Sequence, residues 1–310
     1  MKGLELSRRY YEEHGKPMLE RDFPLLLPYI AVGFVGSGSD RYGFDDEISR
    51  DHHFEPGFCI FLPGEDIVDR RSEFLLERAY AKLPKEYMGF KRQPLSPVGG
   101  NRNGVMRTAD FYLNAVGKAD GKLSTEAWLH IPDYALAEAV NGEVFYDAYG
   151  EFSAIRAELA DMPRDIRLKR IAGNLLIMAQ AGQYNFPRCI KHGEPEAAQL
   201  ACNEFVGAAM KVLFLLRGKY MPYYKWSFRA LRALDAEKKY SEALSFLLCG
   251  GGSAEEKLGV IEKVTSDVIS ELHAHGITKV SCGELEKHAY SVNDCIADGT
   301  IRNMHILIAV

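Results

Sequence analysis

The sequence lacks the features that mark several classes of protein. Its 310 residues include six cysteines, and no two of them form a Cys-x-x-Cys pair. This spacing excludes a zinc ribbon or a disulfide framework and predicts reduced thiols. The charged N-terminus has no apolar signal-peptide core, and no apolar run approaches the roughly 20 residues that span a membrane. We therefore expect a cytoplasmic protein without a membrane partner.

A large excess of positive charge is also missing. The formal net charge is −5, from 38 Lys and Arg against 43 Asp and Glu. A dedicated nucleic-acid-binding protein is usually basic, so we do not expect a nucleic-acid partner. The hydrophobic content of 47% and the charged content of 26% are those of a soluble globular protein, and the length allows two domains.

Residues 30–39 form the most informative stretch, Ile-Ala-Val-Gly-Phe-Val-Gly-Ser-Gly-Ser. An apolar run that ends in small residues predicts a buried strand, followed by a turn whose backbone N–H groups can bind a phosphate. The turn is not a P-loop, because no Gly-Lys-Ser/Thr follows, and Arg41 breaks the G-x-G-x-x-G pattern. Taken alone, it is equally well explained as a plain glycine turn.

Asp51 follows this turn by twelve residues and precedes the apolar run 58–62. A loop that positions phosphates and a carboxylate that holds Mg²⁺ would together bind a nucleoside triphosphate. The acidic cluster at 45–47 is interpreted as a solvated helix start, where carboxylates complement the helix dipole. Residues 99–104, rich in Gly and Asn, predict a surface turn, with a flap over the nucleotide as the alternative.

Four motifs carry a resemblance to a known family. Gly36-Ser-Gly-Ser39, Gly43-Phe-Asp-Asp-Glu47, Ser49-Arg-Asp-His52 and Tyr220-Met-Pro-Tyr-Tyr-Lys-Trp226 resemble a bacterial family of uncharacterised nucleotidyltransferase-like proteins. Their superfamily includes DNA polymerase β and the aminoglycoside nucleotidyltransferases. The resemblance extends over nearly the full length. It implies an α+β protein, with a nucleotidyltransferase-like domain on a small mixed sheet at 1–120 and an all-α domain at 121–310.

The resemblance also implies roles for individual residues. Gly38 and Ser39 would bind the phosphates, and Asp51 would hold Mg²⁺. The superfamily usually has Asp-x-Asp, whereas this chain has Asp51-His52-His53. On a regular strand His53 would face the same side as Asp51 and join the metal shell. An imidazole suits Mn²⁺ better than Mg²⁺, so Mn²⁺ is the alternative metal.

Two residues of the helical part are further candidates. Glu204 lies in the apolar run 201–210, and a buried carboxylate there would act as general base on the acceptor, with its pKa raised by burial. A structural salt bridge is the more frequent explanation for such a residue. Lys225, among aromatic residues, would contact the triphosphate or form a packing corner between domains. Residues 142–150 are expected to link helices at 128–140 and 153–159.

The expected reaction is transfer of a nucleoside monophosphate, AMP from Mg²⁺-ATP, to a hydroxyl of an unidentified acceptor. Two alternatives stay open at this point. One is a pseudoenzyme that binds ATP or another nucleoside triphosphate and regulates another process after losing a metal ligand. The other is an antitoxin-like partner of a second protein.

Overall fold

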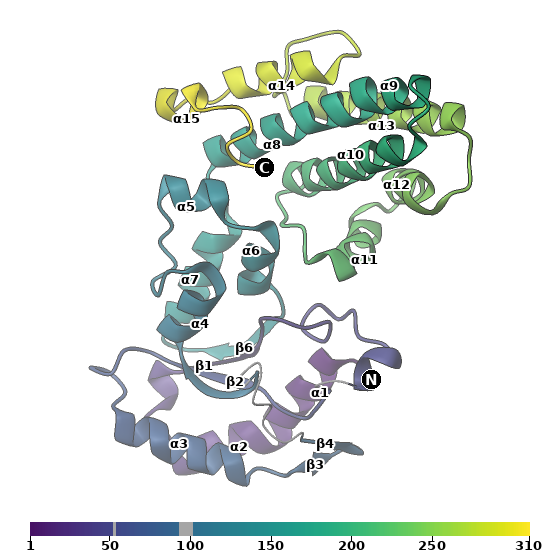
Figure 1. Ribbon diagram of the computed structural model, residues 1–310. Helices are drawn as coiled ribbons and strands as arrows, with labels where there is room; N and C mark the ends of the chain where they lie inside the picture. Colours follow the sequence, from purple (N-terminus) through teal and green to yellow (C-terminus); the bar gives the residue numbers. More distant parts are fainter. Residues whose placement is uncertain (52–53, 93–101) are drawn as a thin grey trace. The chain divides into compact units, whose positions relative to one another are not determined.

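The structure, a computed structural model, describes residues 1–51, 54–92 and 102–310, without the side chains of Arg50 and Asp51. The chain forms two compact units (Figure 1). The first consists of residues 1–123 and 135–160, and the second of residues 124–134 and 161–310. The expectation of an α+β protein with a small mixed sheet and a helical C-terminal part is confirmed.

The first unit is built on a four-stranded sheet with the order β5-β2-β1-β6. β1 pairs antiparallel with both β2 and β6, whereas β2 and β5 are parallel, so the sheet is mixed. All residues of β1 and β2 are buried, as expected for a strand that is covered on both faces. The strands are β1 Ala31–Phe34, β2 Cys59–Leu62, β5 Gly104–Arg107 and β6 Glu143–Asp147.

Helices cover both faces of this sheet (Figure 1). Successive side chains of a strand point to opposite faces, and β2 illustrates this alternation. Ile60 belongs to the core cluster formed with the N-terminal helices and the helix that follows β2. Its neighbour Phe61 stacks on Phe152 on the other face, with ring centroids 4.0 Å apart, and lies 5.3 Å from Phe111.

The remaining elements of the first unit are short helices and one hairpin. Asp69 caps α3 by accepting a hydrogen bond from the Ser72 N–H, so this helix begins at Arg70. The elements are α1 Gly3–Tyr10, η1 Tyr11–Gly15, α2 Lys16–Asp22, η2 Leu27–Tyr29, η3 Ile48–Asp51, α3 Arg70–Lys82, β3 Glu86–Tyr87, β4 Phe90–Lys91, α4 Thr108–Val116, α6 Asp133–Val140 and α7 Glu151–Ala160.

Strand β6 was not expected from the sequence. Its residues 143–147 were interpreted as a link between helices, but they pair with β1. The sheet therefore recruits residues from beyond position 120, and the first unit includes residues 135–160, which the single boundary after residue 120 assigns to the helical part. The helix expected at 128–140 is divided at Pro132, because proline has no N–H to donate within a helix.

The second unit is helical and is centred on α10 Pro195–Leu216. This helix packs against α8, α9 and α12. Among the described residues, it is the helix that is long and apolar enough to cross a membrane, and 67% of its apolar window is buried within the protein, as in a core helix. The other helices are α5 Thr125–His130, α8 Arg164–Met178, η4 Ala179–Asn185, α9 Phe186–Lys191, α11 Tyr224–Leu234, α12 Lys239–Cys249, α13 Ala254–Ala274, α14 Leu285–Asp294 and α15 Gly299–Asn303.

Candidate functional site

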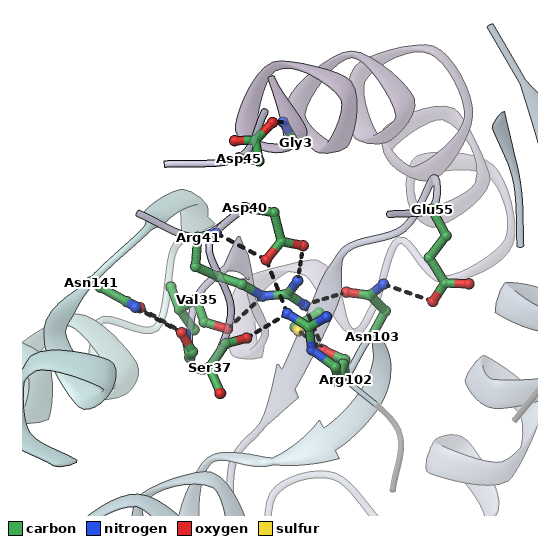
Figure 2. Close-up of polar contacts among 12 residues, drawn as sticks. Gly3, Val35, Ser37, Asp40, Arg41, Asp45, Glu55, Arg102, Asn103 and Asn141 are labelled. Atoms are coloured by element: carbon green, nitrogen blue, oxygen red, sulfur yellow. Dashed lines mark hydrogen bonds and ion pairs between the residues drawn. The ribbon is translucent and has the colours of Figure 1, made fainter. Parts of the chain in front are cut away.

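Strand β1 runs directly into the glycine turn at residues 35–39. Gly36 and Gly38 have φ angles of +100° and +129°, which residues with a side chain rarely adopt. The side chain of Asn141 holds the first of these glycines from both sides. The Gly36 N–H donates to Asn141 Oδ1 at 2.8 Å, and Asn141 Nδ2 donates to the Gly36 carbonyl at 2.7 Å (Figure 2). The turn therefore has a fixed conformation.

Three backbone N–H groups of the turn make no hydrogen bond among the described residues. Within the described ranges 1–51, 54–92 and 102–310, no hydrogen-bond acceptor is found for the N–H groups of Ser37, Gly38 and Ser39. Ser37 is exposed, and the other two residues are half-buried. Successive free N–H groups in a glycine turn form a concavity that suits an anion. This geometry agrees with the phosphate-binding role expected for Gly38 and Ser39 without testing it.

A cluster of opposite charges lies behind the turn. The guanidinium of Arg41, with 1% of its side chain exposed, pairs with the Asp40 carboxylate and donates to the carbonyl of Arg102 at 3.0 Å (Figure 2). It also lies over the ring of Phe34, 3.8 Å from the centroid. Burial lowers the pKa of the Arg41 guanidinium, and the charge of Asp40 opposes this effect. Arg41 thus joins the turn to β1 and to the residues before β5.

Arg102 is the cation that remains accessible at the turn. One of its terminal nitrogens donates to the Ser37 carbonyl and, at 2.9 Å, to Asp40 Oδ1. Its other two nitrogens have no partner in the part of the chain that the structure describes. The side chain is 24% exposed. Its planar donors therefore suit an oxyanion beside the turn. The only hint of Arg102 in the sequence is its place in the segment 99–104, which predicts a surface turn. The residues at the end of this segment contact the glycine turn.

An open pocket of about 330 Å³ adjoins the turn. The first residues of the turn, 35–37, line this pocket with Arg102, and β5 and α4 supply apolar side chains, among them Met106 and Phe111. Two carboxylates also line it, from Asp110 of α4 and from Glu138 of α6. Burial raises the pKa of Glu138, while a hydrogen bond from Ser37 and the charge of Arg102 oppose the rise. The pocket thus combines charged side chains with apolar ones.

The metal ligands expected from the resemblance are only partly described. Asp51 ends the 3₁₀-helix η3, and β2 begins at Cys59, so the expectation that Asp51 and His53 share a strand is wrong for Asp51. The helical turn forms because Asp46 accepts a hydrogen bond from the Ser49 N–H. The side chain of Asp51 and the whole of His53 lie outside the described residues.

No alternative metal site replaces them among the described residues. In residues 1–51, 54–92 and 102–310, no group of three or more His, Cys, Asp and Glu side chains is arranged to hold a metal ion. The Asp40 carboxylate is already paired with Arg41 and Arg102. The described side chains therefore do not fit Mg²⁺ by themselves, and a metal at this site would depend on Asp51 and His53.

Asp45 is a structural residue. We interpreted the cluster at 45–47 as solvated, which is wrong for Asp45, because only 1% of this residue is exposed. Its Oδ2 accepts a hydrogen bond of 3.0 Å from the Gly3 N–H (Figure 2). It therefore caps the N-terminus of α1 from a distant point in the sequence. Asp46 and Glu47 are exposed, as expected.

The two candidates from the helical part lie in the second unit, and both are exposed. Glu204 lies on the outer side of α10, because the helical period turns it away from its buried neighbours Phe205 and Val206. Among the described residues it has no ion-pair partner. The burial that both interpretations of Glu204 required is therefore absent. Lys225 lies in the first turn of α11, beside Tyr224.

The fold and the site together define an α+β protein in which a glycine turn and an arginine form a site suited to an anion. A family model described as a domain of unknown function (DUF4037) matches residues 128–227, which include β6 and the whole of α10 and extend into α11. No curated protein matches the sequence. No solved structure matches it either.

Proposed function

We propose that the first unit binds a nucleoside triphosphate and that the protein transfers a nucleoside monophosphate, AMP from ATP, to a hydroxyl of an acceptor. One observation carries this proposal. The turn at Ser37–Ser39 has unused N–H groups, and its first residue, Ser37, lines the same pocket as Arg102, which has unused guanidinium donors. Backbone donors and a planar cation are the groups that bind polyphosphates in proteins.

The pocket has the size and the polarity that such a ligand needs. Its volume of about 330 Å³ lies at the lower end of ligand pockets, which are roughly 300–1,000 Å³. The phosphates would lie at the turn, and the base would contact the apolar side chains of Met106 and Phe111. Because the pocket combines these apolar side chains with the arginine and the turn, it offers different surfaces to the base and to the phosphates.

The proposed reaction is an in-line substitution at the α-phosphorus. The acceptor oxygen forms a bond to this phosphorus, the bond from it to the bridging oxygen of the β-phosphate breaks, and pyrophosphate leaves. The hydroxyl proton passes to a base. Glu138 lines the pocket and has a pKa raised by burial, as a general base requires, so it is the candidate base within the first unit. The exposed Glu204 lacks that burial. Mg²⁺ or Mn²⁺, if held by Asp51 and His53, would neutralise phosphate charge.

Calorimetric titration with a non-hydrolysable ATP analogue tests the nucleotide site. Arg102→Gln removes the accessible cation and should weaken binding about tenfold or more, because a charged hydrogen bond contributes roughly 1.5–3 kcal/mol. Arg71→Gln is the matched control, since Arg71 is exposed on α3 and away from the pocket. Equal affinities of the two variants would place the nucleotide elsewhere.

A binding protein without transferase activity is the second candidate. It is favoured by His53, which occupies the place of the second carboxylate in the resembling family and offers Mg²⁺ a softer, neutral ligand. A transferase should release pyrophosphate from ATP in the presence of Mg²⁺ or Mn²⁺, and His53→Asp should change this rate. If the wild type binds ATP but releases no pyrophosphate with either metal, the binding protein is the better description.

A further inference from the structure

A second pocket, of about 410 Å³, lies within the second unit. Helices α8 and α10, which pack along one another, contribute to it together with residues 129–134, 221–224 and 309–310. Its lining is mainly apolar, with a small number of polar groups, as is typical of pockets that bind small molecules. This pocket shares no lining residue with the proposed nucleotide site, so an inference about it does not depend on that proposal.

The floor of this pocket contains a buried ion pair. Arg170 of α8 pairs with Asp133 and also donates to the carbonyl of Ile131. Burial raises the pKa of Asp133, while the charges of Arg170 and Lys211 oppose the rise. Among the side chains that line the pocket, two cations, Arg170 and Lys211, thus face the single carboxylate of Asp133.

Lys211 has no partner of its own. It is half-buried on α10, and within the described part of the chain it makes no hydrogen bond and no ion pair. A buried or half-buried ammonium group without a counter-ion is costly, unless a ligand supplies the charge. The pocket thus favours an anionic group on its ligand.

Two further polar atoms at the floor are unpaired. Asn174 is 2% exposed, and its Nδ2 donates to the Arg170 carbonyl at 2.8 Å. Neither Asn174 Oδ1 nor Arg170 Nε has a hydrogen-bond partner among the described residues. Such orphaned groups each cost about 1–3 kcal/mol. One atom is an acceptor and the other a donor, and a hydroxyl group can pair with either.

Aromatic rings stand at the outer part of the pocket. The ring centroids of Tyr134 and Tyr223 are 5.8 Å apart, and those of Tyr223 and Tyr224 are 4.4 Å apart. All three side chains are exposed, so their faces are available to a planar ligand. The segment 128–227, which the family model matches, contains all three tyrosines, Lys211 and the polar floor.

We propose that this pocket binds a small aromatic carboxylate that also carries a hydroxyl group. The carboxylate pairs with Lys211, the hydroxyl reaches Asn174 at the floor, and the ring packs against the tyrosines. Each part of the ligand matches one feature of the pocket: a lysine without a direct ion pair, unpaired polar atoms and a group of exposed aromatic rings. Because all three features lie in one unit, the site is complete without the first unit.

The test is a ligand-observed NMR titration of the full chain with three probes. 4-Hydroxybenzoate carries all three groups, benzoate lacks the hydroxyl, and 4-hydroxybenzyl alcohol lacks the charge. The wild type should bind 4-hydroxybenzoate saturably, and benzoate about fivefold to tenfold more weakly, as expected for one lost hydrogen bond. Absence of saturable binding of 4-hydroxybenzoate up to about 10 mM, the weak limit for a specific ligand of this size, would overturn the proposal.

Variants then assign the contacts. Lys211→Met should weaken 4-hydroxybenzoate about tenfold and leave 4-hydroxybenzyl alcohol unchanged, while Lys211→Arg retains the affinity. Lys219→Met, an exposed lysine outside the pocket, is the matched control. Asn174→Leu should remove the preference for 4-hydroxybenzoate over benzoate. If Lys219→Met and Lys211→Met have equal effects, the anion is not bound in this pocket.

Discussion

Replacing Gly38 by alanine perturbs the turn at its most crowded point. A Cβ atom at this position would lie 1.9 Å from a terminal nitrogen of Arg102 and 2.4 Å from Asp40 Oδ1. The φ angle of +129° adds backbone strain of about 1–3 kcal/mol. Arg102 must move, which weakens charged hydrogen bonds that each contribute about 1.5–3 kcal/mol. Alanine also lowers the conformational entropy of the unfolded chain, which stabilises the folded state by about 0.4–1 kcal/mol. We expect the first unit to lose about 2–4 kcal/mol of stability.

The thiol of Cys59 reports the opening of the first unit alone. It is the single cysteine of residues 1–160, it is 1% exposed, and burial raises its pKa to about 11, so alkylation requires opening. A loss of about 2–4 kcal/mol corresponds to alkylation about 30- to 700-fold faster in native buffer. Cys202, fully buried in the second unit, should keep its rate in the same sample.

Gly43→Ala is the control that separates the effect of backbone strain from the effect of steric clash with Arg102 and Asp40. Its φ angle of +67° also disfavours alanine, but the nearest heavy atom to an added Cβ is 3.8 Å away. This variant should therefore lose only the strain of about 1–2 kcal/mol. If Gly38→Ala accelerates Cys59 alkylation no more than Gly43→Ala does, Arg102 does not lie against the turn, and the description of the site is wrong.

Two further predictions concern the same site. Arg41→Met leaves Asp40 and two backbone carbonyls without their buried cation, which should destabilise the first unit by about 3–5 kcal/mol and accelerate Cys59 alkylation by the corresponding factor. Arg71→Met, on the exposed face of α3, should leave the alkylation rate unchanged. The raised pKa of Glu138 means that its carboxyl takes up a proton above the ordinary value of 4.5, so a negative charge beside the turn disappears as the pH falls through this window. Sulfate, which does not titrate there, should bind the wild type more tightly towards pH 4.5. Glu138→Gln should remove this pH-dependent gain, and an unchanged pH profile in Glu138→Gln would contradict the assignment.

The sequence predicts the central strand and its turn because the signals are local. Residues 30–39 are apolar and then small, and both β1 and the positive-φ glycines follow from that order. β6 is different, because its residues are only half-buried and lie between helices. Its pairing with β1 depends on the rest of the sheet, which no local pattern encodes.

The candidate site, like the fold, is predictable only where its signals are local in the sequence. The run of small residues predicts the turn that contains Gly38 and Ser39, whereas Arg102 contacts Ser37 across 65 positions, a contact that exists because β5 pairs with β2. Glu204 shows the opposite error. An apolar run suggested burial, but the helical period decides which residues of α10 face the core, and Glu204 faces outward.

The most direct measurement is hydrogen exchange of the turn with and without nucleotide. The N–H groups of residues 37–39 have no acceptor in the part of the protein that the structure describes, so a peptide covering 35–41 should exchange rapidly at these positions in the free protein. Saturating Mg²⁺-ATP should slow this exchange about tenfold or more, because phosphate oxygens then accept from these groups. Peptides from α13 should not change. Rapid exchange that persists at residues 37–39 when calorimetry shows ATP bound would contradict the central claim that the turn binds the phosphates.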